Sequence, residues 1–187
     1  MSRLQTVLFL LLFSHIIACA QSQITKSENP DKSIENWKTL NHEKYKINYP
    51  PSWDLKEDGQ MGTSFILFSP SLNETDNFGE NVNLLIQDLT GFNLNLDQYV
   101  ELSEGQITTM IVDGDIILSE RKNNDKGQYH KITYTGKQGF LDLKFEQFYW
   151  VLENKAYVLT LTCKEDKFDD YQRTGEEILH SFQIKQD

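Results

Sequence analysis

A regular alternation of apolar and polar side chains marks residues 45–49. Tyr45, Ile47 and Tyr49 alternate with lysine and asparagine, so they share one face of a β-strand. The strand ends at Pro50-Pro51, because proline has no backbone N–H to donate to a neighbouring strand. The pattern therefore predicts a half-buried strand whose apolar face contacts a core.

Six further segments have the length and composition of strands, rich in β-branched and aromatic residues. They cover residues 65–69, 82–88, 115–121, 129–135, 141–152 and 156–163. The last three are separated by Gly136-Lys137-Gln138-Gly139 and Glu153-Asn154-Lys155, whose glycine and asparagine favour the positive φ of tight turns. We expect these three strands to pair antiparallel in sequence order.

Two segments instead repeat their apolar residues at steps of three and four, the period of an amphipathic helix. The first has Asn95 as its N-cap and Asp97 in its first turn. Its stripe consists of Leu96, Val100, Ser103, Ile107, Met110 and Ile111. The second stripe consists of Phe168, Tyr171, Ile178, Leu179 and Phe182. The predicted fold class is α+β, with helices packed on a central antiparallel sheet.

The N-terminus predicts export and lipid attachment. Arg3 precedes an apolar run over residues 7–13, which has the size of a signal-peptide core and is too short to span a bilayer. Ile16-Ile17-Ala18-Cys19 follows and resembles the lipobox, in which the cysteine thiol is acylated and becomes the new N-terminus. We therefore predict a signal peptide over residues 1–18 and a lipoprotein carrying palmitate and diacylglycerol at Cys19. The alternative is an ordinary secreted protein with a cysteine at this place.

The chain after the signal peptide predicts a lipidated tether and one domain. Residues 19–36 are polar, contain Pro30 and show no apolar periodicity, so we expect a flexible tether. Residues 37–187 suffice for one domain with its own core. Gln21 stands where inner-membrane lipoproteins of enteric bacteria carry aspartate. We therefore predict an outer-membrane protein that faces the periplasm.

The charge of the mature chain argues against nucleic acid as a partner. Loss of Arg3 with the signal peptide leaves 17 of the 18 basic side chains against 28 acidic ones, a formal charge of −11. Phosphate backbones and anionic lipid surfaces attract clustered Lys and Arg and repel an acidic body. We expect the acidity to serve solubility, with a specific acidic patch as the alternative.

No group of residues has the spacing of a catalytic or metal-binding site. Ser64 is not in a nucleophile elbow, because Ile66 stands where the second glycine belongs. The histidines of the mature chain, His42, His130 and His180, fall in different predicted elements and lack the spacing of a metal-binding pair. We therefore predict no catalytic residue, no cofactor and no metal.

A lone cysteine and two acidic clusters are the remaining candidates for chemistry. Cys163 ends the apolar face of a strand, so we expect a buried, unreactive thiol, and acylated Cys19 leaves it no disulfide partner. The acidic clusters are Glu74-Asp76-Glu80 and Glu165-Asp166-Asp169-Asp170. They lack the alternating ligands and central glycine of a calcium loop, which favours a solvated surface over a site for a hard cation.

Several aromatic residues occupy both faces of their strands. They are Trp37, Trp53, Phe148, Tyr149 and Trp150. Helices on both faces of the sheet would bury them, and a surface for docking a partner is the alternative. We favour core packing, because Phe148 and Trp150 share a face that one helix can cover.

The order of these features resembles the PsbP family, whose founding members are extrinsic proteins of the photosystem oxygen-evolving complex. The similar segments are YKINYPPSW at 45–53, FSP at 68–70, NVNLLIQD at 81–88, YTG at 134–136, KAYVLT at 155–160 and SFQI at 181–184. The resemblance implies an αβα sandwich, related in shape to a Ran-GTPase-binding nuclear transport factor, that docks onto partner proteins. It implies no catalytic residues, and the lack of a long N-terminal docking segment speaks against a photosynthetic role.

The leading hypothesis is a non-enzymatic, lipid-anchored PsbP-like domain of the bacterial cell envelope that binds another protein as an accessory or assembly factor. One alternative is a carrier of a small apolar ligand in a cavity between sheet and helix. Another is a hydrolase without a recognisable motif.

Overall fold

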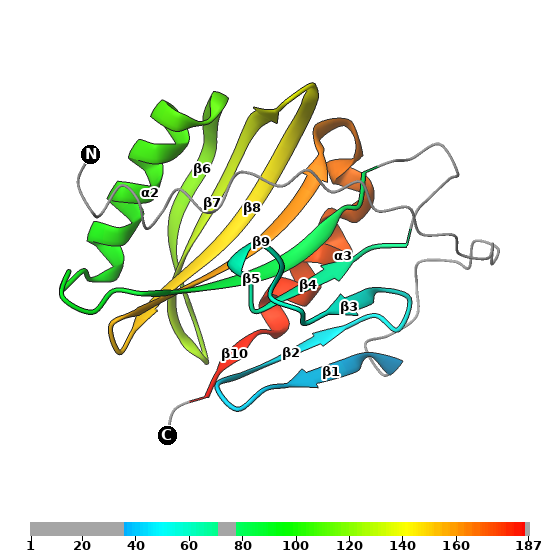
Figure 1. The fold of residues 1–187 in the computed structure, drawn as a ribbon, viewed down its shortest axis with the longest axis horizontal. Helices are drawn as coiled ribbons and strands as arrows, with labels where there is room; N and C mark the ends of the chain where they lie inside the picture. Colours follow the sequence, from blue (N-terminus) through cyan, green and yellow to red (C-terminus); the bar gives the residue numbers. More distant parts are fainter. Residues whose placement is uncertain (1–35, 71–77, 186–187) are drawn as a thin grey trace.

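The computed structural model describes residues 36–70 and 78–185 (Figure 1). The strands are β1 (Lys38–Asn41), β2 (Tyr45–Tyr49), β3 (Asp54–Lys56), β4 (Phe65–Phe68), β5 (Asn81–Asp88), β6 (Val112–Asn124), β7 (Gly127–Gln138), β8 (Leu141–Leu152), β9 (Lys155–Lys164) and β10 (Gln183–Ile184). The α-helices are α2 (Leu96–Met110) and α3 (Phe168–Ser181), and the 3-10 turns are η3 (Gln60–Gly62) and η4 (Glu165–Lys167).

Seven of these strands form an antiparallel sheet in the order β3-β4-β5-β9-β8-β7-β6. The last three predicted strands, β7, β8 and β9, pair antiparallel in sequence order, as expected. Glu153 and Asn154 have φ of 51° and 56° in the β8–β9 turn, which is where the sequence indicated positive φ. Gly136, in contrast, lies within β7 and not in a turn. It is required there because a Cβ atom would lie 2.4 Å from Ile111 Cγ2.

A second, smaller sheet joins β1, β2 and β10. Gln183 of β10 pairs with Lys46 of β2, so the two ends of the described chain lie side by side. Only β2 was predicted from the sequence. β1 and β10 are short and have no alternating burial pattern, so the periodicity that identifies strands is absent from them.

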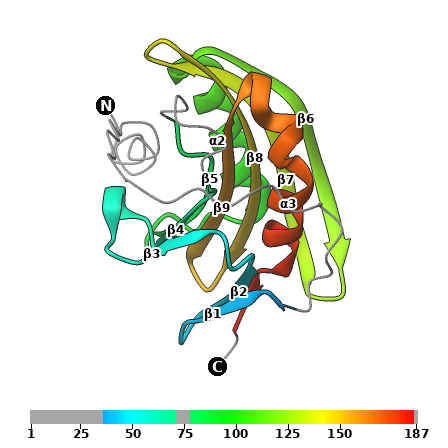
Figure 2. The same cartoon turned by 90° about the vertical axis from the view of Figure 1, so that its right-hand side faces the viewer.

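The two α-helices cover opposite faces of the seven-stranded sheet (Figure 2). Leu159 of β9 belongs to the core that includes Ile178 and Leu179 of α3. Its neighbour Val158 belongs to the core that includes Tyr99 of α2. Since successive side chains of a strand point to opposite faces, the sheet separates two cores. The predicted αβα sandwich is therefore confirmed.

Each helix follows the signals in its sequence. Asn95 caps α2, accepting a hydrogen bond from the backbone N–H of Gln98 at 2.9 Å, and the side chain of Gln98 accepts one from the Asn95 N–H at 3.0 Å. α3 packs closely on β9 because Gly175 faces Leu161, where a Cβ atom would lie 2.5 Å from Leu161 Cδ2. In the described ranges, neither helix is long and apolar enough to cross a membrane.

Candidate functional site

The predicted site residues are dispersed or lie outside the described part of the chain. Cys19, the signal peptide, residues 19–35 of the tether, Glu74 and Asp76 fall outside residues 36–70 and 78–185. The three histidines lie apart: His42 stacks on Tyr45 with ring centroids 4.5 Å apart, His180 meets the ring of Phe148 at 5.0 Å, and His130 contacts Ser119 of β6. Among the described residues, no group of three or more His, Cys, Asp or Glu side chains is arranged to hold a metal ion.

Cys163 and the aromatic residues belong to the core. Cys163 is fully buried, and burial raises the pKa of its thiol well above the usual value, with the carboxylates of Glu80 and Glu146 acting in the same direction. Trp53, Phe148 and Tyr149 are buried, and Trp37 and Trp150 pack against the core under α3. These aromatic residues therefore pack the interior, as the favoured interpretation expected, and do not form a docking surface.

A buried charged cluster links α3 to the sheet. Lys131 Nζ lies 2.8 Å from Glu146 Oε2 and 2.9 Å from Glu176 Oε1. Glu146 of β8 is 1% exposed, and its Oε1 atom has no hydrogen-bond partner among the described residues. Lys131 therefore holds two carboxylates, one from β8 and one from α3, with a single ammonium group.

The two carboxyl groups of this cluster have pKa values shifted in opposite directions. Burial raises the pKa of Glu146, because the hydrogen bond from Lys131 offsets only part of the desolvation. Burial acts the same way on Glu176, but its hydrogen bonds from Lys131 and Gln172 prevail and lower its pKa. Desolvation opposes the charge of Lys131, but its hydrogen bonds to the two carboxylates prevail and raise its pKa. Glu146 is thus the group that takes up a proton first as the pH falls.

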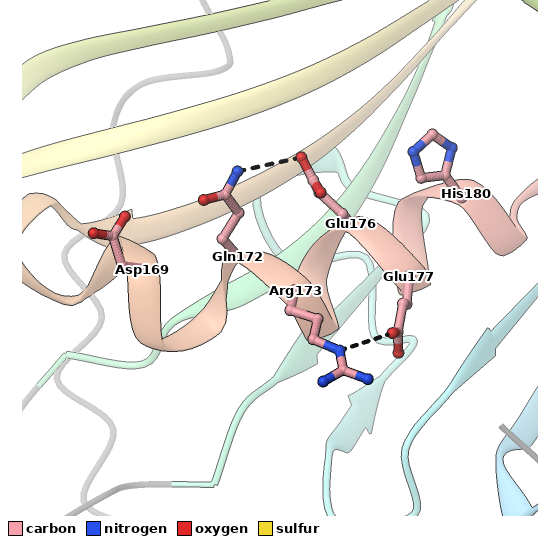
Figure 3. Close-up of a pocket in the computed structure, with 6 residues that line it drawn as sticks. All are labelled: Asp169, Gln172, Arg173, Glu176, Glu177 and His180. Carbon is pink, nitrogen blue, oxygen red and sulfur yellow. Dashed lines mark hydrogen bonds and ion pairs between the residues drawn. The ribbon is translucent and has the colours of Figure 1, made fainter. Parts of the chain in front are cut away.

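A polar hollow of about 350 Å³ lies along the outer side of α3 (Figure 3). It is lined by Asp169, Gln172, Arg173, Glu176, Glu177 and His180, which come from successive turns of that helix. Gln172 donates to Glu176 at 3.3 Å and Arg173 to Glu177 at 3.4 Å, so several of these groups are already paired. The carrier hypothesis expects a cavity between sheet and helix, whereas this hollow lies along the outer side of α3.

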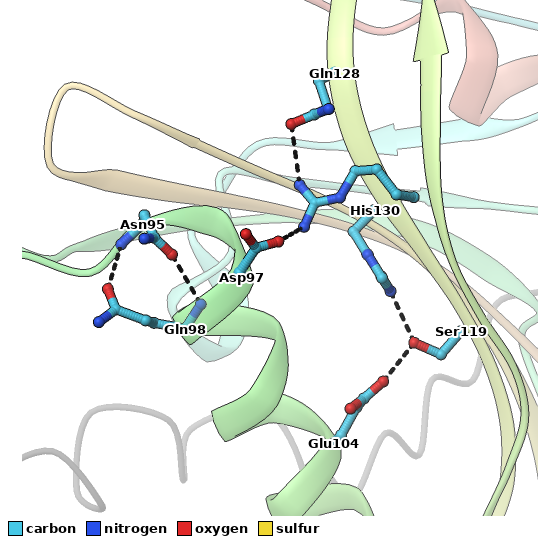
Figure 4. Close-up of polar contacts among 8 residues, drawn as sticks. Asn95, Asp97, Gln98, Glu104, Ser119, Gln128 and His130 are labelled. Carbon is cyan, nitrogen blue, oxygen red and sulfur yellow. Dashed lines mark hydrogen bonds and ion pairs between the residues drawn. The ribbon is translucent and has the colours of Figure 1, made fainter.

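A second polar network ties β6 to α2 (Figure 4). Arg121 of β6 forms an ion pair with Asp97 of α2 and donates to Gln128 of β7 at 3.4 Å. Two residues before Arg121, the hydroxyl of Ser119 donates a hydrogen bond to the carboxylate of Glu104. Ser119 Oγ also lies 2.8 Å from His130 Nε2. These contacts fix the C-terminal half of β6 against the helix.

Ser119, His130 and Glu104 do not have the roles of a catalytic triad. In a triad the carboxylate orients the histidine, which accepts the serine proton. Here the Ser119 proton points to Glu104, so His130 Nε2–H donates to Ser119, and burial together with nearby Arg121 lowers the pKa of His130 and keeps it neutral. His130 Nδ1, which would need the carboxylate, is buried without a hydrogen-bond partner among the described residues. The arrangement suits a structural link and offers no activated nucleophile.

The large apolar side chains left exposed gather at one edge of the sheet. Within residues 36–70 and 78–185 they are Val112, Ile117 and Leu118 of β6, and Phe140 and Leu141 at the β7–β8 turn. Phe140 is completely exposed, Val112 is 64% exposed and Ile117 is 55% exposed. Val112 pairs with Lys137 and Gln138 with Leu141, so the turn lies next to the start of β6. We call these five residues the β6 edge surface.

The backbone of β6 is irregular where it carries these residues. Its pairing with β7 shifts between Val112 and Asp115 and again between Ile116 and Leu118, and Asp113 has a φ of 53°. Gly114 allows β6 to pass beneath α2, because a Cβ atom there would lie 2.1 Å from the carbonyl oxygen of Ile107. Bulges re-aim side chains and interrupt a free edge. The two irregularities of β6 therefore expose Val112, Ile117 and Leu118 to solvent. They also hinder another strand from forming a continuous hydrogen-bond ladder with β6.

Acidic side chains surround the β6 edge surface. Lys137 Nζ lies 2.7 Å from Asp113 and 3.8 Å from Asp142. Asp115 has no ion pair among the described residues and is exposed. Three carboxylates and one ammonium group leave this region with net negative charge. An apolar patch with a charged rim is typical of a protein-binding surface.

Sequence reasoning missed the β6 edge surface, although a signal exists. Ile116-Ile117-Leu118 is a run of three apolar residues in a strand, so both faces carry apolar side chains. Ile116 packs on the core under α2, and its neighbour Ile117 is exposed. The run would indicate an exposed patch only if β6 were known to be an edge strand.

Comparisons with known proteins bear on the fold. No protein-family model matches the sequence, and no curated protein matches it. Among solved structures, cyanobacterial PsbP (CyanoP) from Synechocystis sp. PCC 6803 superposes with a TM-score of 0.56. The match covers 86% of this chain and 98% of that one at 14% identity. The chain has a PsbP-like fold.

Two other proteins superpose on this PsbP-like fold. LpqN, involved in cell envelope biogenesis of Mycobacterium tuberculosis, gives a TM-score of 0.58 over 84% of this chain and all of LpqN, at 10% identity. Protein PA94 of Pseudomonas aeruginosa gives 0.54 over 78% of this chain and 94% of its own, at 11% identity. At such identities the similarity concerns the PsbP-like fold alone, so function must be argued from the surface of this chain.

Proposed function

We propose that this chain is a non-enzymatic lipoprotein of the bacterial cell envelope that binds another envelope protein through the β6 edge surface. The observation that carries the proposal is the position of exposed Val112, Ile117, Leu118, Phe140 and Leu141 along one edge of the seven-stranded sheet. Exposed apolar clusters with a polar rim are characteristic of protein interfaces, and aromatic residues such as Phe140 are frequent in them.

The envelope location rests on the N-terminal sequence. A signal peptide over residues 1–18, acylation at Cys19 and a tether to residue 36 would hold the domain beside a membrane, with Gln21 favouring the outer membrane. LpqN, which shares the fold, is involved in cell envelope biogenesis, and this agrees with the same location.

The proposed non-enzymatic role is supported by two polar networks among the described residues. Glu104 accepts a hydrogen bond from the Ser119 hydroxyl, and Lys131 pairs with both Glu146 and Glu176. In neither place does a nucleophile face a base within a cleft. The polar groups of these two networks instead tie α2 and α3 to the sheet.

Photocrosslinking in intact cells tests the proposal. The photoreactive residue p-benzoylphenylalanine would replace Phe140 or Ile117 on the β6 edge surface, and Arg173 on α3 as the matched control. We expect a specific adduct with one envelope protein from Phe140 and Ile117, and none from Arg173. Absence of a protein adduct from both edge positions, with wild-type levels of folded chain, would refute docking at this surface.

A further inference from the structure

The charges around the β6 edge surface define what kind of partner it fits. Asp113, Asp115 and Asp142 lie beside the exposed apolar residues, and among the described residues only Lys137 forms an ion pair with any of them. Lys137 already pairs with Asp113 and Asp142, so the carboxylate of Asp115 is the one left without a cation among the described residues. A partner group that approaches Ile117 meets uncompensated negative charge next to apolar contact area.

The basic residues of β6 do not compensate this charge. Arg121 is bound to Asp97 on the side of α2, and Lys122 pairs with Glu120 at 2.7 Å. Both lie in the C-terminal half of the strand, beyond Leu118. The strand is therefore divided into an acidic, apolar half before Ser119 and an internally paired half after it.

From this division we infer that the docked partner presents lysine or arginine next to apolar side chains, and contacts the Val112–Leu118 half of β6 through side chains. The inference rests on the proposed function. The two register shifts fall within that half, so a partner strand cannot continue the backbone ladder there without breaks. Contact by side chains is the remaining mode, with cations opposite Asp115 and the Asp113–Asp142 pair.

A second copy of the chain fits this surface poorly. The mature chain has a formal charge of −11, so two copies repel each other, and the cations of β6 are already engaged in ion pairs. An anionic lipid surface is disfavoured for the same reason, since Asp113 and Asp142 would approach it together with Phe140. A basic protein surface satisfies both the apolar residues and the carboxylates.

The test combines the crosslinker at Ile117 with charge variants in the full-length, membrane-anchored chain. Asp115→Asn should lower the yield of the protein adduct about twofold and Asp115→Lys about fivefold, the range expected for exposed charge pairs. The matched control is Glu101→Lys, which changes an exposed carboxylate on α2 by the same charge and should leave the yield unchanged. Mass spectrometry of the adduct should place lysine or arginine next to the crosslinked partner residue.

The outcomes separate this inference from the proposed function. A protein adduct that is insensitive to Asp115→Lys, or whose crosslinked peptide is acidic, would leave docking at the β6 edge surface standing and would overturn the basic partner. An adduct between two copies of the chain, or with lipid, would also overturn it. Loss of every adduct in the unmodified background would refute docking itself.

Discussion

At the scale of single residues, the buried charges of this domain stabilise contacts between elements. Glu146 is almost completely buried in β8, where an unpaired carboxylate would be strongly destabilising, and Lys131 supplies its countercharge. Lys131 also reaches Glu176 of α3. The cluster is therefore asymmetric, since the ammonium group is essential to both carboxylates and each carboxylate is only one of two partners of the ammonium group.

This asymmetry predicts different effects of Lys131→Met and Glu146→Gln on stability. At pH 7, Lys131→Met should lower the free energy of unfolding by roughly 3 kcal/mol, because it leaves two carboxylates without a cation. Glu146→Gln should change it by less than about 1 kcal/mol, because the Lys131–Glu176 pair remains. Urea unfolding of both variants in a Cys19→Ala background gives the comparison.

The pH dependence of the two variants follows from the direction of the pKa shifts. Because the pKa of Glu146 is raised above its ordinary value of 4.5, this group favours the folded state below pH 4.5 and disfavours it as the pH rises through the folded value. Glu146→Gln should therefore gain stability relative to wild type as the pH rises from 4.5 through the folded-state pKa of Glu146. The deficit of Lys131→Met should shrink as the pH falls through the raised pKa of Glu146, which lies above 4.5, because this carboxylate then loses its charge. A deficit that stays constant from about pH 4 to about pH 8 would contradict the charge explanation.

Cys163 provides a second prediction at this scale. Its thiol is fully buried and its pKa is raised by burial, so both access and thiolate formation are suppressed in the folded chain. In a Cys19→Ala background, a thiol reagent at pH 7 should label Cys163 only as fast as the domain opens, and rapidly in urea. The control is Thr39→Cys, an exposed position that should react at once. Equally fast labelling of Cys163 in native protein would show that the core under α3 is open.

At the scale of elements, two glycines in helices should respond to alanine in opposite ways. Gly175→Ala places a Cβ atom 2.5 Å from a methyl group of fully buried Leu161, and should destabilise the domain by about 1–2 kcal/mol after the gain in helix propensity. Gly105→Ala meets nothing within 4 Å and should stabilise α2 by about 1 kcal/mol. Thermal unfolding of the pair checks both. A stabilising Gly175→Ala would mean that α3 is not pressed against β9.

The elements with a strong repeat were predictable from the sequence, and those that depend on tertiary contacts were not. The cap at Asn95 and the stripe that follows determine α2, and the alternation at Tyr45 determines β2. β10 has only two residues, and it forms because the chain end meets Lys46 across a sequence separation that no local pattern encodes. Of the turn predicted over residues 136–139, Gly139 has the expected positive φ of 61°. Gly136 lies within β7 instead, since nothing in the sequence reveals that Ile111 packs against it.

The same reasoning explains why the candidate site was missed. The aromatic residues that suggested docking are core residues, because aromatic content alone does not distinguish burial from exposure. The exposure of Ile117 and Val112 follows from the position of β6 at the edge of the sheet and from its bulges. Both are properties of strand order and register, which become known only once the sheet is assembled.

At the scale of the whole molecule, the acidic charge and the predicted lipid anchor are complementary. A mature chain of formal charge −11 is repelled by anionic headgroups, so we expect acyl chains to hold it near a membrane. Each buried methylene contributes about 0.8 kcal/mol, and two or more chains give firm attachment. The domain itself then remains free to turn the β6 edge surface toward a partner.

Replacement of Cys19 tests whether acyl chains at this residue hold the protein at the membrane. Cys19→Ala should abolish incorporation of labelled palmitate and move the chain from the membrane fraction to the soluble fraction, because no other part of the mature sequence has the composition of a membrane anchor. Cys163→Ser is the matched control, since it removes the other cysteine and should stay in the membrane fraction with its label. Partial retention of Cys19→Ala that disappears in an Ile117→Asp double variant would show that the partner is itself membrane-bound. Full retention with no palmitate in either protein would refute the lipid anchor.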